Sequence, residues 1–176
     1  MIVTLIGYRG CGKSSVAPLL AERLGCSWID SDDEVVREAG CTIQQIFSNH
    51  GEAEFRRREA SVLERLLSGS PQVIAAGGGA ILDPKNRSRM RAAGPVVWLQ
   101  ASAETLAARI AADSGTAQQR PSLTGRSVTE EVADVLQQRF PAYQDAATIV
   151  VDVDDRSPAE VAAAILERLP TEEPCP

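Results

Sequence analysis

The sequence predicts an α/β fold in which helices flank a central parallel sheet of five strands. Two observations lead to this prediction: five short apolar runs rich in β-branched residues recur along the chain, and amphipathic segments separate them. Such alternation is typical of a doubly wound, three-layer arrangement with right-handed crossovers. With 176 residues, 44% of them hydrophobic, the chain is long enough to bury a substantial core.

The first predicted strand is IVTLIG at residues 2–7, a continuous apolar run that is typical of a strand buried on both faces. Because Trp28 and Trp98 fall on predicted strands, we expect both indole rings in the core. The four later runs are CSWID at 26–30, QVIAAG at 72–77, PVVWLQ at 95–100 and TIVVDV at 148–153.

Capping and proline signals predict where the helices begin and end. Pro84 and Pro158 occupy the favoured first helical position, whereas Pro18 falls inside the helix after the first strand. Pro141 predicts the end of a helix near residue 140. Four capping boxes, each a Ser or Thr followed three residues later by Glu or Gln, are Ser31–Glu34, Thr42–Gln45, Ser127–Glu130 and Ser157–Glu160.

Composition excludes several classes of protein. The chain has 18 basic and 24 acidic residues, a net charge of −6, so it lacks the basic surface that nucleic acid requires. No apolar run approaches the roughly 20 residues of a membrane helix, and no signal sequence opens the chain. The four cysteines show neither CxxC spacing nor the density of a disulfide framework, and His50 is the only histidine. We therefore expect a reduced, cytoplasmic setting and no zinc site.

The run GYRGCGKS at residues 7–14 follows a predicted strand and precedes a predicted helix, which is the context of a phosphate-binding P-loop. Gly10 and Gly12 permit the sharp turn that directs successive N–H groups toward a β-phosphate. Lys13 would bridge the β- and γ-phosphates, and the Ser14 hydroxyl would reach a Mg²⁺ ion. The loop therefore predicts a site for the phosphates of a nucleotide, with Mg²⁺ as the cofactor.

A P-loop is shared by kinases, GTPases and motor ATPases. No NKxD sequence is present, and the chain is small for a motor ATPase, so the sequence favours a kinase of small molecules. Such an enzyme needs a pocket for the acceptor of the phosphoryl group. Four segments are candidates: WIDSDDE at 28–34, GEAEFRRRE at 51–59, AGGGA at 76–80 and QQRFPAY at 137–143.

Each segment also has an ordinary structural explanation. Asp30 and Asp32 lie where a strand ends at the ligand crevice, but helix N-termini favour acidic residues anyway. The arginines at 56–58 resemble a solvated helix face, although one of them must point away from the other two. The triple glycine fits a plain turn, and the helix dipole favours Arg139 near a helix C-terminus. Taken singly, the segments leave both explanations open.

In order, these segments resemble the shikimate kinase family from Ile2 to about Leu169. The resemblance implies a P-loop kinase fold that transfers the γ-phosphoryl group of ATP to the 3-hydroxyl of shikimate, in the chorismate pathway of aromatic amino acid biosynthesis. Ser122 departs from the family, which usually has leucine there. The matching motifs are GYRGCGKS, DSD, IFSNHGEAEFRRRE, GGG, RPSL and RFPAY.

The resemblance also implies roles for individual residues. Lys13, Asp32 and Arg120 would be catalytic, with Asp32 at the acceptor hydroxyl and Arg120 over the transferring phosphoryl group. Mg²⁺ would be held by Ser14 and, through water, by Asp30. ATP would be bound by Gly10, Cys11, Gly12, Lys13, Ser14, Ser15, Arg109, Arg120, Arg156 and Pro158. Shikimate would be bound by Asp32, Arg56, Gly77, Gly78, Gly79 and Arg139.

Two arginines suit a carboxylated ring because each can form paired, charge-assisted hydrogen bonds to a carboxylate. Close to Arg56 and Arg139, the pKa of Asp32 is expected to be lowered. A weak base is sufficient here, because phosphoryl transfer depends mainly on positioning and charge stabilisation.

We expect a single domain at residues 1–170, with an acceptor-binding helical region at about 31–60 and a frayed tail at 171–176. Residues 112–126 are polar, contain two glycines and a proline, and lack apolar periodicity, which predicts a lid. Since one domain carries both halves of the site, we expect a monomer.

Two alternatives remain open from the sequence. One is a kinase of another small hydroxy acid such as gluconate, or of a nucleoside monophosphate. The other is a catalytically silent relative that binds nucleotide. The pair Arg56 and Arg139 favours a carboxylated ring, and the presence of Lys13, Asp32 and Arg120 argues against a silent relative.

Overall fold

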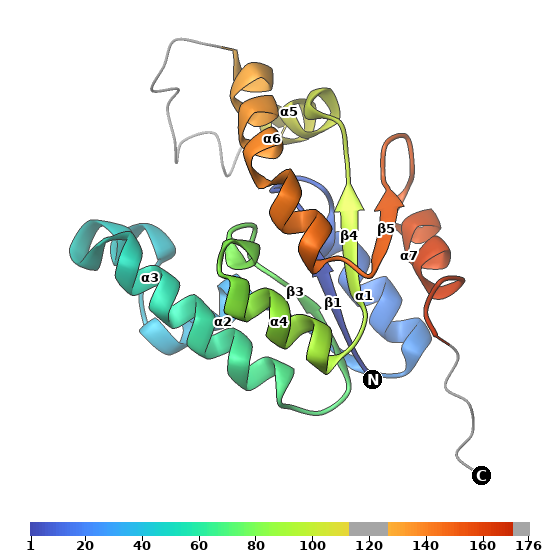
Figure 1. The fold of residues 1–176 in the computed structure, drawn as a ribbon, viewed down its shortest axis with the longest axis horizontal. Helices are drawn as coiled ribbons and strands as arrows, with labels where there is room; N and C mark the ends of the chain where they lie inside the picture. Colours follow the sequence, from blue (N-terminus) through green and yellow to red (C-terminus); the bar gives the residue numbers. More distant parts are fainter. Residues whose placement is uncertain (113–126, 171–176) are drawn as a thin grey trace.

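A parallel sheet of five strands forms the centre of the computed structural model, which describes residues 1–112 and 127–170 (Figure 1). The strands follow the order β2-β3-β1-β4-β5, so β1 lies in the middle. Its parallel pairing with β3 places Leu5 beside Ala75, near the carboxyl ends of both strands. The strands are β1 (Ile2–Ile6), β2 (Ser27–Asp30), β3 (Gln72–Ala75), β4 (Val96–Gln100) and β5 (Ile149–Asp152).

Helices cover both faces of this sheet, which confirms the predicted three layers. α3, α4 and the C-terminal part of α6 pack on one face, and α1 and α7 pack on the other (Figure 1). Within the described ranges, no helix is long and apolar enough to cross a membrane. The helices are α1 (Lys13–Leu24), α2 (Ser31–Ala39), α3 (Ile43–Leu67), the 3-10 helix η1 (Ala80–Leu82), α4 (Pro84–Ala93), α5 (Ala103–Ala112), α6 (Val128–Ala146) and α7 (Pro158–Leu166).

The sheet separates two apolar cores, because consecutive strand residues point to opposite faces. On β1, Val3 and Leu5 belong to one core and Ile6 to the other. All residues of β1 are buried, as predicted. On β4, Trp98 is buried and its ring stacks on that of Tyr143, with the two centroids 5.2 Å apart. The expectation for this indole is therefore confirmed.

β2 differs from its prediction. It lies at the edge of the sheet, and Trp28 is 41% exposed, so the expectation that this indole lies in the core is wrong. The physical reason is that an apolar run predicts a strand but carries no information on which strand becomes an edge. The crossover connections decide the strand order.

Three of the four predicted capping boxes are present, at Thr42, Ser127 and Ser157. The fourth prediction is wrong, because Asp30 caps α2: its Oδ1 accepts a 2.9 Å hydrogen bond from the backbone N–H of Asp32. Ser31 is instead the first helical residue and is buried.

The prolines at the first positions of α4 and α7 lie as predicted, and Pro18 lies inside α1. The helix end predicted at Pro141 is wrong, because α6 continues to Ala146. Tyr143 and Ala146, in the turns after the proline, are fully buried. Their burial offsets the backbone hydrogen bond that a proline cannot donate.

Candidate active site

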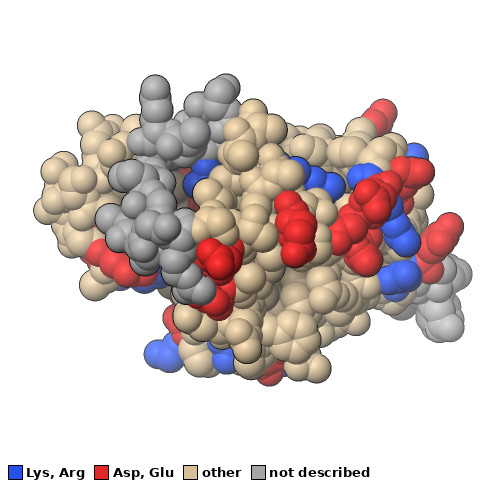
Figure 2. All heavy atoms as spheres, turned by 90° about the horizontal axis from the view of Figure 1, so that it is seen from above, with Lys and Arg blue, Asp and Glu red and all other residues tan. Residues whose placement is uncertain are grey.

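A large cleft opens at the carboxyl ends of β1, β2 and β3 and has a volume of about 1210 Å³. Figure 2 looks down on the molecule from above, where some Lys and Arg side chains lie recessed between other residues, and others stand out at the edges beside Asp and Glu side chains. The cleft is lined by the P-loop, the start of α2, part of α3, the triple glycine, and α6. It therefore brings together all four candidate acceptor segments and the phosphate loop.

The P-loop turns sharply between β1 and α1. Gly7, Gly10 and Gly12 have positive φ angles of 150°, 83° and 97°. A side chain at Gly7 would meet the Cys11 sulfur and a backbone oxygen at under 3.0 Å, so the loop requires glycine there. The Nζ of Lys13 donates to the carbonyls of Gly7 at 2.9 Å and Tyr8 at 3.2 Å. Its ammonium group is thereby held over the loop.

Ser14 and Asp30 meet beside the loop. The Ser14 hydroxyl donates a 2.9 Å hydrogen bond to Oδ2 of Asp30. Mg²⁺ prefers oxygen ligands and usually takes only one or two from the protein, with phosphate and water supplying the rest. In the described part of the chain, no cluster of three or more His, Cys, Asp or Glu could hold a metal ion by itself. The hydroxyl and carboxylate present here fit a Mg²⁺ ion bound together with a nucleotide.

Asp32 lies in the first turn of α2, and its Oδ1 is buried with no hydrogen-bond partner in the described structure. Burial, reinforced by the negative charges of Asp30 and Glu59, raises the pKa of Asp32 to about 6. The expectation of a lowered pKa is therefore wrong. Lys13 and Arg56 do act to lower it, but loss of solvation is the larger effect.

Of the three consecutive arginines on α3, only Arg56 lines the cleft. Its Nη1 donates a 2.7 Å hydrogen bond to Glu59, which is buried, and its other nitrogens reach Glu52 at 3.3 Å. Burial raises the pKa of Glu59. Arg57 and Arg58 both pair with Glu54, away from the cleft.

The triple glycine is explained by close approach of side chains. A Cβ at Gly77 would lie under 3.0 Å from Oδ1 of Asp32, and one at Gly79 would collide with the guanidinium of Arg56. Gly78 has room for a methyl group, with its nearest neighbours at 3.7 Å. The segment is thus not a plain turn, because two of its glycines make space for predicted acceptor-binding residues.

Arg139 reaches the same cleft from α6. Its Nη1 donates a 3.0 Å hydrogen bond to the carbonyl of Gly78, and its guanidinium lies 5.8 Å from the ring centroid of Tyr8. The Tyr143 hydroxyl donates to the same carbonyl at 3.4 Å, and burial raises the pKa of this phenol. Arg56 and Arg139 therefore line one cleft and do not face separate surfaces.

The cleft also contains the residues predicted around the adenine. Arg109 donates to the carbonyls of Gly10 at 3.4 Å and Val153 at 3.1 Å, and Arg156 and Pro158 line the same cleft. Arg120, Ser122 and the predicted lid from residue 113 onward lie outside the described residues.

The sequence model of the family described as "SKI: Shikimate kinase" matches residues 9–170. The chain belongs to the shikimate kinase family. It is 42% identical over 167 residues to a shikimate kinase of Rhodopirellula baltica, covering 95% of this chain and 89% of that protein. It is 43% identical over 169 residues to one of Symbiobacterium thermophilum, covering 96% of each. As a member of this family the chain is an ATP-dependent phosphotransferase.

Solved structures agree with the family assignment. The shikimate kinase of Acinetobacter baumannii in complex with shikimate superposes with a TM-score of 0.86 at 36% identity, covering 94% of this chain and 90% of that one. The shikimate kinase of Aquifex aeolicus gives a TM-score of 0.79 at 31% identity, covering 95% and 94%. A gluconokinase of Sinorhizobium meliloti gives 0.58 at 22% identity, over 94% and 89%, which shows a shared fold only.

Two residues of this shikimate kinase family site were not predicted from the sequence. Glu59 accepts a hydrogen bond from Arg56. Because Glu59 lies three residues after Arg56 on the same helix, the spacing of the two charges could have predicted this pair. Tyr143 bonds Gly78, and no sequence signal indicates this contact, because the two residues meet only in the folded chain.

Proposed function

We propose that this protein transfers the γ-phosphoryl group of ATP to the 3-hydroxyl of shikimate, giving shikimate 3-phosphate and ADP. One observation carries the proposal: Arg56 and Arg139, from different helices, line the same cleft as the P-loop. Two guanidinium groups can bind one carboxylate through paired hydrogen bonds and so fix which hydroxyl of the ring faces the nucleotide.

The acceptor would lie between these arginines and the triple glycine. Arg56 is held by Glu59 and Arg139 by the Gly78 carbonyl, so both guanidinium groups are positioned by protein contacts. Gly77, Gly78 and Gly79 would face the ring hydroxyls, where the absence of side chains allows close approach.

Asp32 would accept the proton of the attacking hydroxyl. With a pKa of about 6, it is mainly ionised at neutral pH and is a stronger base than an ordinary aspartate. The hydroxyl oxygen forms a bond to the γ-phosphorus, the bond from phosphorus to the bridging oxygen of ADP breaks, and the proton passes to Asp32. The transition state is loose, so positioning and charge stabilisation contribute most.

The nucleotide would be bound at the other end of the cleft. Backbone N–H groups of the P-loop from Gly10 to Ser15, including that of Cys11, would contact the phosphates together with Lys13. Arg109, Arg156 and Pro158 would border the adenine. Ser14 and Asp30 would hold Mg²⁺, which when bound neutralises charge on the phosphate oxygens. Arg120 would act over the transferring group as part of a lid at residues 112–126.

All residues proposed for the site belong to one chain, so we also propose a monomer in which residues 1–170 form one domain. Because the four cysteines show neither CxxC spacing nor the density of a disulfide framework, we also propose a cytoplasmic location. Size-exclusion chromatography with light scattering would test the oligomeric state.

The direct test measures ADP release with shikimate, gluconate, a nucleoside monophosphate and no acceptor. We expect turnover with shikimate that is lost in Arg139→Ala and kept in Arg57→Ala, whose arginine pairs with Glu54 outside the cleft. Turnover with gluconate or a nucleotide would support another acceptor class. ATP binding without turnover would support a silent relative.

A further inference from the structure

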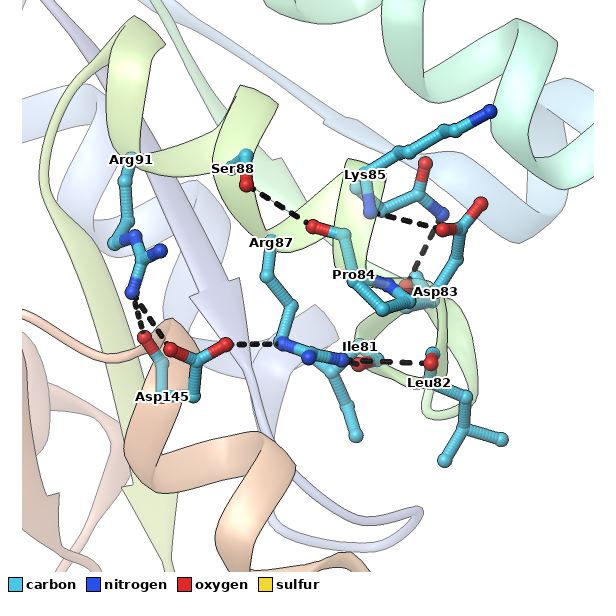
Figure 3. Close-up of polar contacts among 11 residues, drawn as sticks. Ile81, Leu82, Asp83, Pro84, Lys85, Arg87, Ser88, Arg91 and Asp145 are labelled. Carbon is cyan, nitrogen blue, oxygen red and sulfur yellow. Dashed lines mark hydrogen bonds and ion pairs between the residues drawn. The ribbon is translucent and has the colours of Figure 1, made fainter.

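The 3-10 helix η1, which follows the triple glycine directly, is held from behind by side chains of α4. Nη1 of Arg87 donates to the carbonyl of Ile81 at 2.8 Å and to that of Leu82 at 3.4 Å (Figure 3). The amide nitrogen of Asn86, which is buried, donates to the carbonyl of Ala80 at 3.1 Å. All three backbone carbonyls of η1 are therefore bonded by two consecutive residues of α4, and neither residue lines the cleft.

Arg87 also reaches α6. Its Nε donates to Oδ2 of Asp145 at 2.5 Å, and the side chain of Arg87 is only 16% exposed (Figure 3). Arg91 donates to the other carboxylate oxygen at 3.0 Å and to the backbone carbonyl of Asp145. Hydrogen bonds from Arg87 and then Arg91 lower the pKa of Asp145. One guanidinium group thus joins η1 to the last turn of α6.

Both connected elements lead into the acceptor site. η1 begins immediately after Gly79, next to Arg56. α6 carries Arg139 and Tyr143, which both bond the carbonyl of Gly78. Arg87 therefore closes a ring of contacts behind the cleft, from the glycine loop through η1 and Asp145 to α6 and back to Gly78.

We propose that Arg87 is a positioning residue for the acceptor: by bonding η1 and Asp145 together, it fixes Arg139 relative to the glycine loop and Arg56. This inference rests on the proposed function, because it assumes that the two arginines share one carboxylate. A guanidinium fork is needed for the task, because Nε and Nη1 point to different partners and a lysine has a single nitrogen. A shift of about 1 Å between such groups is enough to weaken productive binding strongly.

The neighbouring arginines of α4 provide matched controls. Arg89 pairs with Glu64 of α3, and in the described structure it makes no hydrogen bond or ion pair with η1 or α6. Arg91 bonds Asp145 but has no bond to η1. We therefore expect three arginines of α4 to differ in their effect on acceptor binding. Replacing Arg87 should weaken it most, replacing Arg91 less, and replacing Arg89 not at all.

The test compares Arg87→Met, Arg87→Lys, Arg91→Met and Arg89→Met with the unaltered protein in steady-state kinetics. For Arg87→Met we expect KM for shikimate to rise about tenfold, with kcat and KM for ATP within about twofold. Arg87→Lys is expected to be intermediate, and Arg89→Met unchanged. A KM for shikimate in Arg87→Met equal to that of Arg89→Met would overturn the inference, as would equal losses for ATP and shikimate.

Hydrogen exchange gives a second readout that does not depend on the substrate. The amides of Ala80 and Leu82 donate to the carbonyls of Gly77 and Gly79, each at 3.0 Å. We expect both amides to exchange faster in Arg87→Met and Arg87→Lys, and at the normal rate in Arg89→Met. If Arg87→Met does not fold, KM for shikimate and the exchange of these two amides in Arg87→Lys test the proposal in its place. If the unaltered protein fails to phosphorylate shikimate, the proposed function is wrong, and the exchange rates still decide whether Arg87 fixes this loop.

Discussion

Arg139 donates a 3.0 Å hydrogen bond from its Nη1 to the carbonyl of Gly78, a residue 61 positions earlier in the chain. The bond holds the guanidinium of α6 against the loop that follows β3. In the acceptor role that we propose for Arg139, a side chain held by such a contact would lose less conformational entropy on binding. Substitution of Arg139 is therefore a sharp test of the proposed acceptor site.

The first prediction concerns the guanidinium group of Arg139 and its several N–H donors. Arg139→Lys keeps the positive charge but cannot bond Gly78 and a carboxylate in the same geometry. We expect KM for shikimate to rise about 10- to 100-fold with little change in KM for ATP, measured by ADP release at varied concentrations of each. Arg23→Lys, an exposed substitution in α1, is the control. An unchanged KM for shikimate would show that Arg139 does not bind the acceptor.

The second prediction concerns the pH dependence of catalysis. Asp32 must be ionised to accept the hydroxyl proton, and its pKa is about 6. We expect kcat/KM for shikimate to fall about tenfold per pH unit as the pH drops below about 6, since this ratio reports the free enzyme. A profile that stays flat down to pH 5, where an ordinary aspartate is still ionised, would contradict the role of this carboxylate.

The third prediction concerns stability. Folding raises the pKa of Asp32 from 3.8 to about 6, so ionised Asp32 destabilises the folded state. This penalty is absent below pH 3.8, grows between 3.8 and 6, and is constant above 6. We therefore expect Asp32→Asn to increase the free energy of unfolding by about 1–3 kcal/mol at pH 8, and progressively less toward pH 4.

Urea unfolding at pH 4, 5, 6 and 8 measures this difference, and the same variant is expected to lose most of its activity. The neighbouring Asp33→Asn serves as control, because Asp33 is exposed and its effect should be smaller. A stabilisation that is independent of pH would mean that the carboxylate charge is not its cause.

The fourth prediction concerns the glycines. In Gly79→Ala the new methyl group would displace the end of the Arg56 side chain, which is flexible enough to move without unfolding the protein. We expect a rise of about tenfold in KM for shikimate with a nearly unchanged unfolding midpoint. Gly78→Ala, where the new methyl group would make only ordinary contacts at 3.7 Å or more, is the matched control for stability and for the position of Arg56 in a crystal structure. Arg56 in its original place in Gly79→Ala would refute the steric explanation.

The sequence predicted all five strands because a strand in a parallel sheet is a short apolar run, and its length and composition are local properties. The exposure of Trp28 was not predictable, because it depends on the position of β2 at the sheet edge. Likewise Pro141 suggested a helix end, but the burial of Tyr143 beyond it is a tertiary effect.

The site shows the same division between local and tertiary effects. The motifs placed Lys13 and Arg139 in one site, and the cleft contains both. The pKa of Asp32 was wrongly expected to be lowered, because nearby charges can be inferred from a motif but desolvation cannot. Arg87 carried no sequence signal, since its partners at η1 and Asp145 are brought together only by the packing of α4 against α6.

The register between β1 and β3 has a consequence for how this scaffold can change. Because Leu5 pairs with Ala75, the P-loop and the triple glycine, which we propose to hold the donor and the acceptor, leave the sheet at one level and on neighbouring strands. The backbone hydrogen bonds between β1 and β3, and not the side chains of the cleft, therefore set the spacing between the P-loop and the triple glycine. Substitutions in the proposed acceptor pocket would therefore change its side chains and leave this backbone spacing as it is.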